Sequence, residues 1–188
     1  MLIGVLAIQG GFEAHVRMLE RLGAGTRIVR TPADLDGLDG LVIPGGESTT
    51  MTLGIEREGL AEPLRELVRS GTPVLGTCAG LIMLDRAHLG LLDVLANRNA
   101  FGRQVHSFEA ELELSGLSAP LHAVFIRAPW VDERGAAVEV LAEIDGHPVA
   151  VRQGNITAVA FHPELTDDTR VHELLLDQVR AGKVGQHA

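Results

Sequence analysis

Apolar runs alternate with amphipathic segments along the first half of the chain. Continuous apolar runs, typical of parallel strands buried on both faces, occur at residues 2–8, 41–43 and 73–75, and a further strand is expected over residues 26–29. Apolar residues at helical spacing follow at 12–22 and at 60–68, and another helix is expected to begin near Ala79. This β-α-β-α order predicts a doubly wound, mostly parallel sheet.

The second half of the chain is richer in predicted strands. Strands are expected over residues 104–114, 121–126, 137–143, 148–151 and 156–161, and a last helix over 169–181. Asp145-Gly146 and Gly154-Asn155 are typical of hairpin turns. Because no linker or repeat divides the chain, we predict one domain over residues 1–188. Its fold class is α/β with three layers, a flavodoxin- or Rossmann-like sheet flanked by helices with a β-rich second half.

Composition and charge narrow the possible environments and partners. The 188 residues are 46% apolar and 22% charged, as in ordinary globular proteins. A net charge of −9 disfavours nucleic acid and anionic membranes as partners. The single cysteine permits no internal disulfide, and no apolar segment approaches the roughly 20 residues that span a bilayer. With no basic stretch before the first apolar run, these features predict a cytoplasmic protein.

That single cysteine, Cys78, lies in Gly76-Thr77-Cys78-Ala79-Gly80, directly after an apolar run. The arrangement predicts a nucleophile elbow, in which a sharp turn carries the nucleophile between a strand and a helix. Glycines suit such a turn because a Cβ would collide with the crowded backbone. A helix N-terminus also favours the thiolate. The alternative is a buried structural cysteine.

Candidate partners for this cysteine occur in Phe161-His162-Pro163-Glu164-Leu165. His162 comes at the end of an expected strand, and active sites of α/β sheets assemble at that edge. Pro163 stiffens the link to Glu164, whose carboxylate can fix the imidazole tautomer and stabilise the imidazolium. The alternative is a surface histidine followed by an acidic helix cap. Together with the elbow, the motif predicts a Cys-His-Glu triad.

Five sequence blocks, spread over nearly the whole chain, resemble those of class I (triad) glutamine amidotransferases. The chain is most similar to the glutaminases of pyridoxal 5′-phosphate synthase, in vitamin B6 biosynthesis. The elbow and the His-Pro-Glu motif are common to class I. The other three blocks are Leu6-Ala7-Ile8-Gln9-Gly10, Pro44-Gly45-Gly46-Glu47-Ser48-Thr49-Thr50 and Arg98-Asn99-Ala100-Phe101-Gly102-Arg103-Gln104, with Phe125-Ile126-Arg127-Ala128-Pro129 as a further match. The stretches within 44–50, 98–104 and 125–129 narrow the resemblance to the vitamin B6 branch.

The resemblance implies a reaction, its site residues and its partners. Cys78, His162 and Glu164 would hydrolyse L-glutamine, and the ammonia would pass to a separate synthase subunit in a hetero-oligomeric complex. The residues implied to bind glutamine are Gly46, Glu47, Ser48, Arg103, Ile126 and Arg127. Two consecutive glycines allow a loop to turn N–H groups toward a ligand, so Gly45, Gly46 and Ala79 are the candidate oxyanion donors. The alternative for this loop is a plain turn with Ser48 as helix N-cap.

Two departures from the family pattern concern contacts rather than chemistry. Ala14 stands where a glutamate is expected before His15, at a turn that the resemblance implicates in synthase contacts. The loop over residues 85–88 is also shorter than expected.

Other chemistries fit the sequence less well. The histidines are scattered without metal-ligand spacing, and no nucleotide-binding glycine motif occurs, so we expect neither a metal nor a cofactor. Three alternatives remain: the glutaminase of another ammonia-channelling complex such as imidazole glycerol phosphate synthase, a cysteine peptidase or chaperone-like relative, and a non-enzymatic regulatory subunit. The last is disfavoured because all three triad positions are filled.

Overall fold

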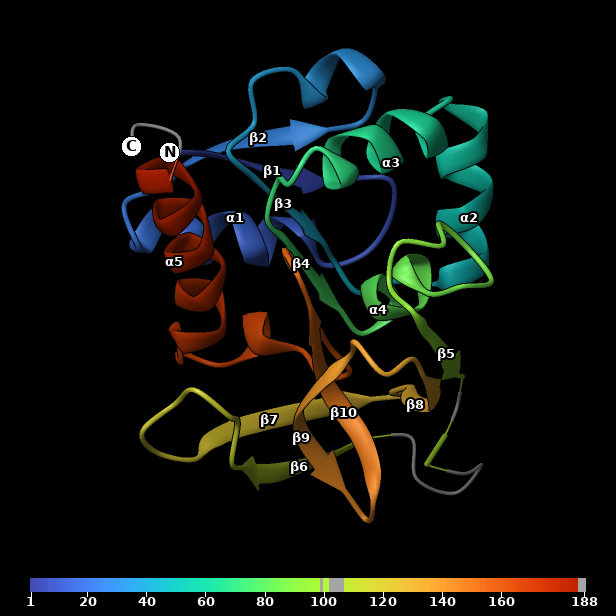
Figure 1. Cartoon of the computed structure of the whole chain (residues 1–188), viewed down its shortest axis with the longest axis vertical. Helices are drawn as coiled ribbons and strands as arrows, with labels where there is room; N and C mark the ends of the chain where they lie inside the picture. The colour runs from blue at the N-terminus through green and yellow to red at the C-terminus, as the bar shows by residue number, and fades with distance from the viewer. Residues whose placement is uncertain (99, 102–106, 186–188) are drawn as a thin grey trace.

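A mostly parallel sheet forms the centre of the molecule. The computed structural model describes residues 1–98, 100–101 and 107–185, and these contain a seven-stranded sheet (Figure 1). Its five parallel strands are β2, β1, β3, β4 and β11, and β10 and β9 continue it in antiparallel pairing. In spatial order the strands are β2 (Gly25–Val29), β1 (Leu2–Leu6), β3 (Gly40–Ile43), β4 (Val74–Thr77), β11 (Ile156–Val159), β10 (His147–Gln153) and β9 (Glu139–Ile144). The predicted sheet is confirmed.

Helices cover both faces of this sheet, as the three-layer prediction requires. One face carries α1 (Phe12–Arg21) and α5 (Arg170–Gly185), and the other carries α2 (Ser48–Arg57), α3 (Ala61–Arg69) and α4 (Ala79–Leu84) (Figure 1). Successive side chains of a strand point to opposite faces. Two separate apolar cores therefore form, and both are supplied by the same strands.

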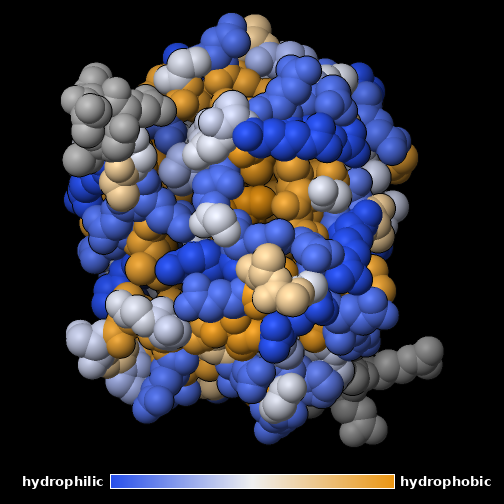
Figure 2. Space-filling model, viewed as in Figure 1, coloured by the Kyte–Doolittle hydropathy of each residue, from blue (hydrophilic) through white to orange (hydrophobic). Residues whose placement is uncertain are grey.

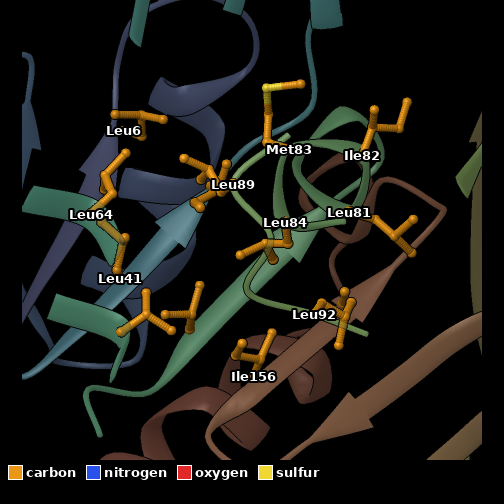
Figure 3. Packing of buried hydrophobic residues seen from close by; sticks show 14 of the residues in the cluster. Leu6, Leu41, Leu64, Leu81, Ile82, Met83, Leu84, Leu89, Leu92 and Ile156 are labelled. Carbon is orange, nitrogen blue, oxygen red and sulfur yellow. The ribbon is translucent and has the colours of Figure 1, made fainter. Parts of the chain in front are cut away.

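Strand β3 illustrates this division of the core. Leu41 and Ile43 pack toward α3 and α4, in the core drawn in Figure 3, whereas Val42 packs toward α1 and α5. All three side chains are fully buried, and each such burial stabilises the fold by about 1.5–3 kcal/mol. The continuous apolar runs of the sequence thus correspond to strands covered on both faces.

The β-rich second half extends the sheet and adds two small ones. Asp145 and Gly146 have φ of 52° and 77° and connect β9 to β10, as expected for a type I′ hairpin. Outside the main sheet, β6 (Ser107–Leu112) pairs with β7 (Leu121–Ile126), and β5 (Val94–Asn97) pairs with β8 (Trp130–Arg134). Strand β7 has the predicted bounds, and β6 falls within its predicted range. Strands β5 and β8 were not predicted, because each is only four or five residues long and β8 ends in three exposed polar residues.

In the part of the chain that the structure describes, two short 3-10 helices complete the secondary structure, at Pro32–Leu35 and Pro163–Leu165. The face in Figure 2 is covered largely by polar side chains, with apolar residues visible mainly between them. Within the described residues, no helix is long and apolar enough to cross a membrane. The predicted triad residues and the Gly45–Gly46 loop follow the neighbouring strands β3, β4 and β11 at their carboxyl ends.

Candidate active site

Cys78 occupies the predicted sharp turn between β4 and α4. Its φ is +49°, in a region that L-residues rarely adopt, and its N–H donates to Val159 O at 2.8 Å. A Cβ on Gly80 would lie 2.0 Å from Ile43 O. A Cβ on Gly76 would lie 2.6 Å from a methyl group of Leu84. The glycines on both sides of the nucleophile are therefore required by close packing.

His162 and Glu164 adjoin the end of β11, and their side chains form the predicted pair. His162 Nδ1 lies 2.7 Å from Glu164 Oε1, and the His162 N–H is held by Val124 O of β7 at 2.8 Å. Pro163 opens the 3-10 turn that folds Glu164 back beneath the imidazole. Because Nδ1 donates to the carboxylate, Nε2 is the nitrogen left to face a thiol.

The electrostatics of this pair suit a base beside a nucleophile. Burial lowers the pKa of His162, but interactions with Cys78 and Glu164 outweigh burial and raise that pKa to about 10. Burial alone would raise the pKa of Glu164, yet its hydrogen bond with His162 and the nearby His15 and His162 bring it below its ordinary value. Glu164 is therefore an anion that holds a strongly basic imidazole.

A cavity of about 580 Å³ opens over Cys78 and His162. Five predicted glutamine-binding residues line it: Gly46, Glu47, Ser48, Ile126 and Arg127. Ala79 lines it as well, whereas Arg103, also predicted, lies outside the described residues. Ile82 and Arg98 line the cavity without having been predicted. A second cavity of about 580 Å³ is also lined by Glu164, but neither Cys78 nor His162 is among its lining residues.

The Gly45–Gly46 loop has a defined orientation beside Cys78. The Gly45 N–H donates to Thr77 Oγ1 at 3.1 Å, and the Gly45 carbonyl accepts from the Gly11 N–H at 3.2 Å. In a trans peptide the N–H points opposite to the carbonyl, so the Gly46 N–H is turned away from Gly11. The Gly46 N–H is thus the donor that this loop can offer to the cavity, while Gly45 holds the peptide in place.

Glu47, not Ser48, caps helix α2. The Glu47 carboxylate accepts from the Thr49 N–H at 3.0 Å and from the Thr50 N–H at 2.8 Å. The Thr50 hydroxyl and these two N–H groups lower the pKa of Glu47 to about 2. The alternative in which Ser48 is the N-cap is wrong, because the longer glutamate side chain reaches the free N–H groups and Ser48 begins the helix.

Arg98 is a functional candidate that the sequence analysis passed over. Its Nη2 donates to His88 Nε2 at 2.8 Å, and His88 Nδ1 lies 2.7 Å from the buried Asp85 carboxylate. This chain of contacts holds a guanidinium at the cavity wall, where it can pair with a carboxylate. Its signal in the sequence was its place at the start of the block 98–104, but only the fold brings that block to the cavity.

Comparison with known proteins decides the family. The model of the SNO glutamine amidotransferase family matches residues 5–181. This chain belongs to that family. A relative from Mycobacteroides abscessus, named "Pyridoxal 5′-phosphate synthase subunit PdxT", is 54% identical over 96% of this chain and 98% of its own length. A relative of the same name from Fervidobacterium nodosum is 51% identical over 95% of this chain and 97% of its own.

Solved structures agree with the family assignment. A protein described as glutamine amidotransferase has a TM-score of 0.89 and 45% identity, and the match covers 94% of this chain and 98% of the other. A putative GMP synthase subunit from Thermoplasma acidophilum has a TM-score of 0.76 at 20% identity, which shows a shared fold alone. The predicted class I glutamine amidotransferase, with its resemblance to the pyridoxal 5′-phosphate synthase branch, is confirmed over the alternative from another complex.

Proposed function

We propose that this glutamine amidotransferase hydrolyses L-glutamine to glutamate and ammonia with Cys78, His162 and Glu164 as its triad. The observation that carries the proposal is the juxtaposition of three groups from two loops, Cys78 after β4 and the His162–Glu164 pair after β11. Cys78 and His162 line one cavity, and Glu164 holds His162 from behind at 2.7 Å. A nucleophile, a base and an orienting carboxylate in that order constitute an acyl-transfer site.

The first half of the reaction forms an acyl-enzyme. His162 takes the Sγ proton of Cys78, and the thiolate adds to the side-chain amide carbon of glutamine. Glu164 stabilises the resulting imidazolium. The imidazolium then protonates the amide nitrogen, the C–N bond breaks, and ammonia leaves a γ-glutamyl thioester on Cys78.

The second half regenerates the enzyme. His162 takes a proton from water, the hydroxide adds to the thioester, and the C–S bond breaks to release glutamate and the thiolate. In both halves a tetrahedral oxyanion forms next to Cys78. The N–H groups of Gly46 and Ala79 are the proposed donors to it, each worth on the order of 10²–10³ in rate.

Recognition of glutamine falls to the rest of the cavity wall. Gly46, Glu47 and Ser48 at one side and Ile126 and Arg127 at the other are the proposed contacts, and Arg103 is retained as a proposal from the family resemblance. Arg127, like Cys78, has a positive φ, at +45°, although it carries a side chain. Such strain persists where the surrounding structure demands it, often at ligand sites.

The partner is inferred from the relatives. Because relatives at 50% identity or more are named subunits of pyridoxal 5′-phosphate synthase, we assign the synthase subunit as the acceptor of the ammonia. A glutaminase working without that acceptor would waste substrate, so the free chain is expected to be poorly active.

The test combines activity, labelling and the partner. Glutamate release is measured with and without the synthase subunit, for wild type and Cys78→Ala, and a diazo-ketone glutamine analogue is used to label the protein. We expect the alanine variant to fold and to release no glutamate, and the label to map to Cys78 in wild type. Release by Cys78→Ala near the wild-type rate, or labelling at another residue, would refute the triad.

A further inference from the structure

Two histidines lie behind the triad, and the mechanism above uses neither. His15 of α1 and His172 of α5 are both fully buried, and His15 Nδ1 lies 2.8 Å from His172 Nε2. His15 belongs to the sequence motif around Ala14, whereas His172 lies in none of the motifs of the sequence. Buried polar groups without a partner are costly, so a buried pair of this kind calls for an explanation.

The contacts determine which nitrogens carry protons. Burial lowers the pKa of His15 to about 4 and that of His172 to about 3, so both rings are neutral near pH 7. His15 Nε2 lies 3.3 Å from Glu164 Oε2, which as a carboxylate only accepts, so the His15 proton is on Nε2. His15 Nδ1 must then accept from His172 Nε2–H. Of the four ring nitrogens, only the unprotonated His172 Nδ1 is left without a partner.

The Nε2–H of His15 points between two acceptors that belong to different parts of the site. One is Glu164 Oε2, a buried oxygen with no well-aligned hydrogen bond of its own. The other is Thr77 Oγ1 at 3.2 Å, which in turn accepts the Gly45 N–H at 3.1 Å. One imidazole therefore stands between the carboxylate that orients His162 and the loop that carries the Gly46 N–H.

We propose that His15 is a positioning residue of the glutaminase reaction. It contacts both Glu164 and Thr77, and so fixes the position of the base His162 relative to the Gly46 N–H that donates to the oxyanion. His172 selects the tautomer of His15 that makes this possible. Both linked groups act on the transition state rather than on bound glutamine. Loss of the link therefore lowers kcat and leaves KM for glutamine nearly unchanged.

This inference rests on the proposed function, and its test uses two readouts. The first is kcat and KM for glutamine with the synthase subunit at saturation. The second is the rate of Cys78 alkylation by iodoacetamide across pH, which depends on His162 and Glu164 but needs neither glutamine nor an oxyanion hole. The variants are His15→Leu, which removes the donor, His15→Gln, which keeps an N–H near Nε2, and the nearly isosteric Thr77→Val.

We expect His15→Leu to lower kcat by roughly 10- to 100-fold with KM within about threefold, and to shift the alkylation profile. His15→Gln should recover most of this loss. Thr77→Val should lower kcat but leave alkylation unchanged, because only the loop contact is broken. The control is Leu19→Ala, a fully buried change on α1 that destabilises the fold but should leave kcat per folded molecule unchanged.

Several results would overturn the proposal. Wild-type kcat in His15→Leu, or equal loss in His15→Leu and His15→Gln, would reduce His15 to a packing residue. If His15→Leu does not fold, Thr77→Val carries the test, and an unchanged kcat there refutes the link. Wild-type protein without glutaminase activity would refute the proposed function instead, and the alkylation profiles would still report on the His15–Glu164 contact.

Discussion

Individual residues in strained conformations mark the site. The described residues include three non-glycine residues with positive φ: Cys78, Arg127 and Asp145. Asp145 is explained by its hairpin turn, whereas Cys78 and Arg127 both line the active-site cavity. Each such conformation costs on the order of 1–3 kcal/mol and must be enforced by its surroundings. For Cys78, the N–H held by Val159 and the packing of Gly76 and Gly80 enforce it.

At this scale, His162→Ala should be more damaging than Glu164→Gln. Removal of the base should lower kcat by about 10⁶, and removal of the orienting charge by about 10⁴, as in other triads. Glu164 raises the pKa of His162, so Glu164→Gln should also move that pKa downward from about 10. Steady-state kinetics and an NMR titration of the His162 ring measure the two effects. Equal losses in both variants would mean that the third triad member is misassigned.

Arg98 offers a test of substrate recognition. We expect Arg98→Ala to raise KM for glutamine by roughly tenfold with a smaller change in kcat, since the guanidinium can pair with the substrate carboxylate but touches no reacting atom. Glutaminase kinetics with the synthase subunit present provide the measurement. Arg69→Ala, an exposed arginine on α3, is the control. An unchanged KM in Arg98→Ala would remove this residue from the binding site.

At the scale of elements, the site depends on contact between two loops that follow neighbouring strands. The loop after β1 reaches the Gly45–Gly46 loop after β3, where Gly11 N–H donates to Gly45 O. Gly10 lies in this contact with φ of +99°, and a Cβ there would come within 1.8 Å of Gly45 O. The orientation of the Gly45–Gly46 peptide is therefore coupled to a turn outside the cavity, where a partner subunit could act on it.

Gly10→Ala should displace the Gly45–Gly46 peptide and lower glutaminase activity by at least tenfold, because both its φ and its Cβ conflict with this contact. Gly23→Ala is the matched control, because Gly23 also has a positive φ, +76°, but has open space around it. The control should lose about 1 kcal/mol of stability and no activity. Both variants are assayed with and without the synthase subunit. Full activity and full activation by the partner in Gly10→Ala would exclude the coupling.

At the scale of the whole molecule, the buried histidine pair links stability to pH. The pKa of His172 is about 3 in the folded state, whereas its ordinary value, which holds in the unfolded chain, is 6.5. The unfolded chain therefore binds more protons between these values, and stability falls as the pH decreases from 6.5 toward 3. His15, with a pKa of about 4 in the folded state, likewise lowers stability as the pH decreases from 6.5 toward 4. The exposed His122 has the opposite effect on stability. Because Glu111 and Glu109 raise its pKa, it stabilises the fold at low pH, and this contribution is lost as the pH rises.

We expect His172→Leu to flatten the loss of stability below pH 6.5, where a histidine with a depressed pKa costs about 1.4 kcal/mol per pH unit. Urea midpoints measured from pH 7 down to pH 4.5 test this. His122→Ala is the control and should remove stability at low pH instead. A profile for His172→Leu as steep as that of wild type would show that the buried ring is not responsible.

The sequence by itself determined the features that depend on neighbouring residues. Continuous apolar runs predicted the parallel strands, because a strand covered on both faces has no polar side. The glycines around Cys78 predicted the nucleophile elbow, and the short His162-Pro163-Glu164 segment predicted the contact between the imidazole and the carboxylate. Both depend on turns and hydrogen bonds that form within a few residues. The three proposed triad residues could therefore be named from the sequence alone.

Only the tertiary structure decided the contacts that join distant segments. His15 and His172 are far apart in the sequence and meet because α1 and α5 pack on the same face of the sheet. Arg98 opens the sequence block 98–104, but only the fold brings it to the cavity wall. The local sequence determines which residues are buried and where the chain turns. Which distant segments meet depends on the order of strands and helices in the whole fold, and this order cannot be read from one segment.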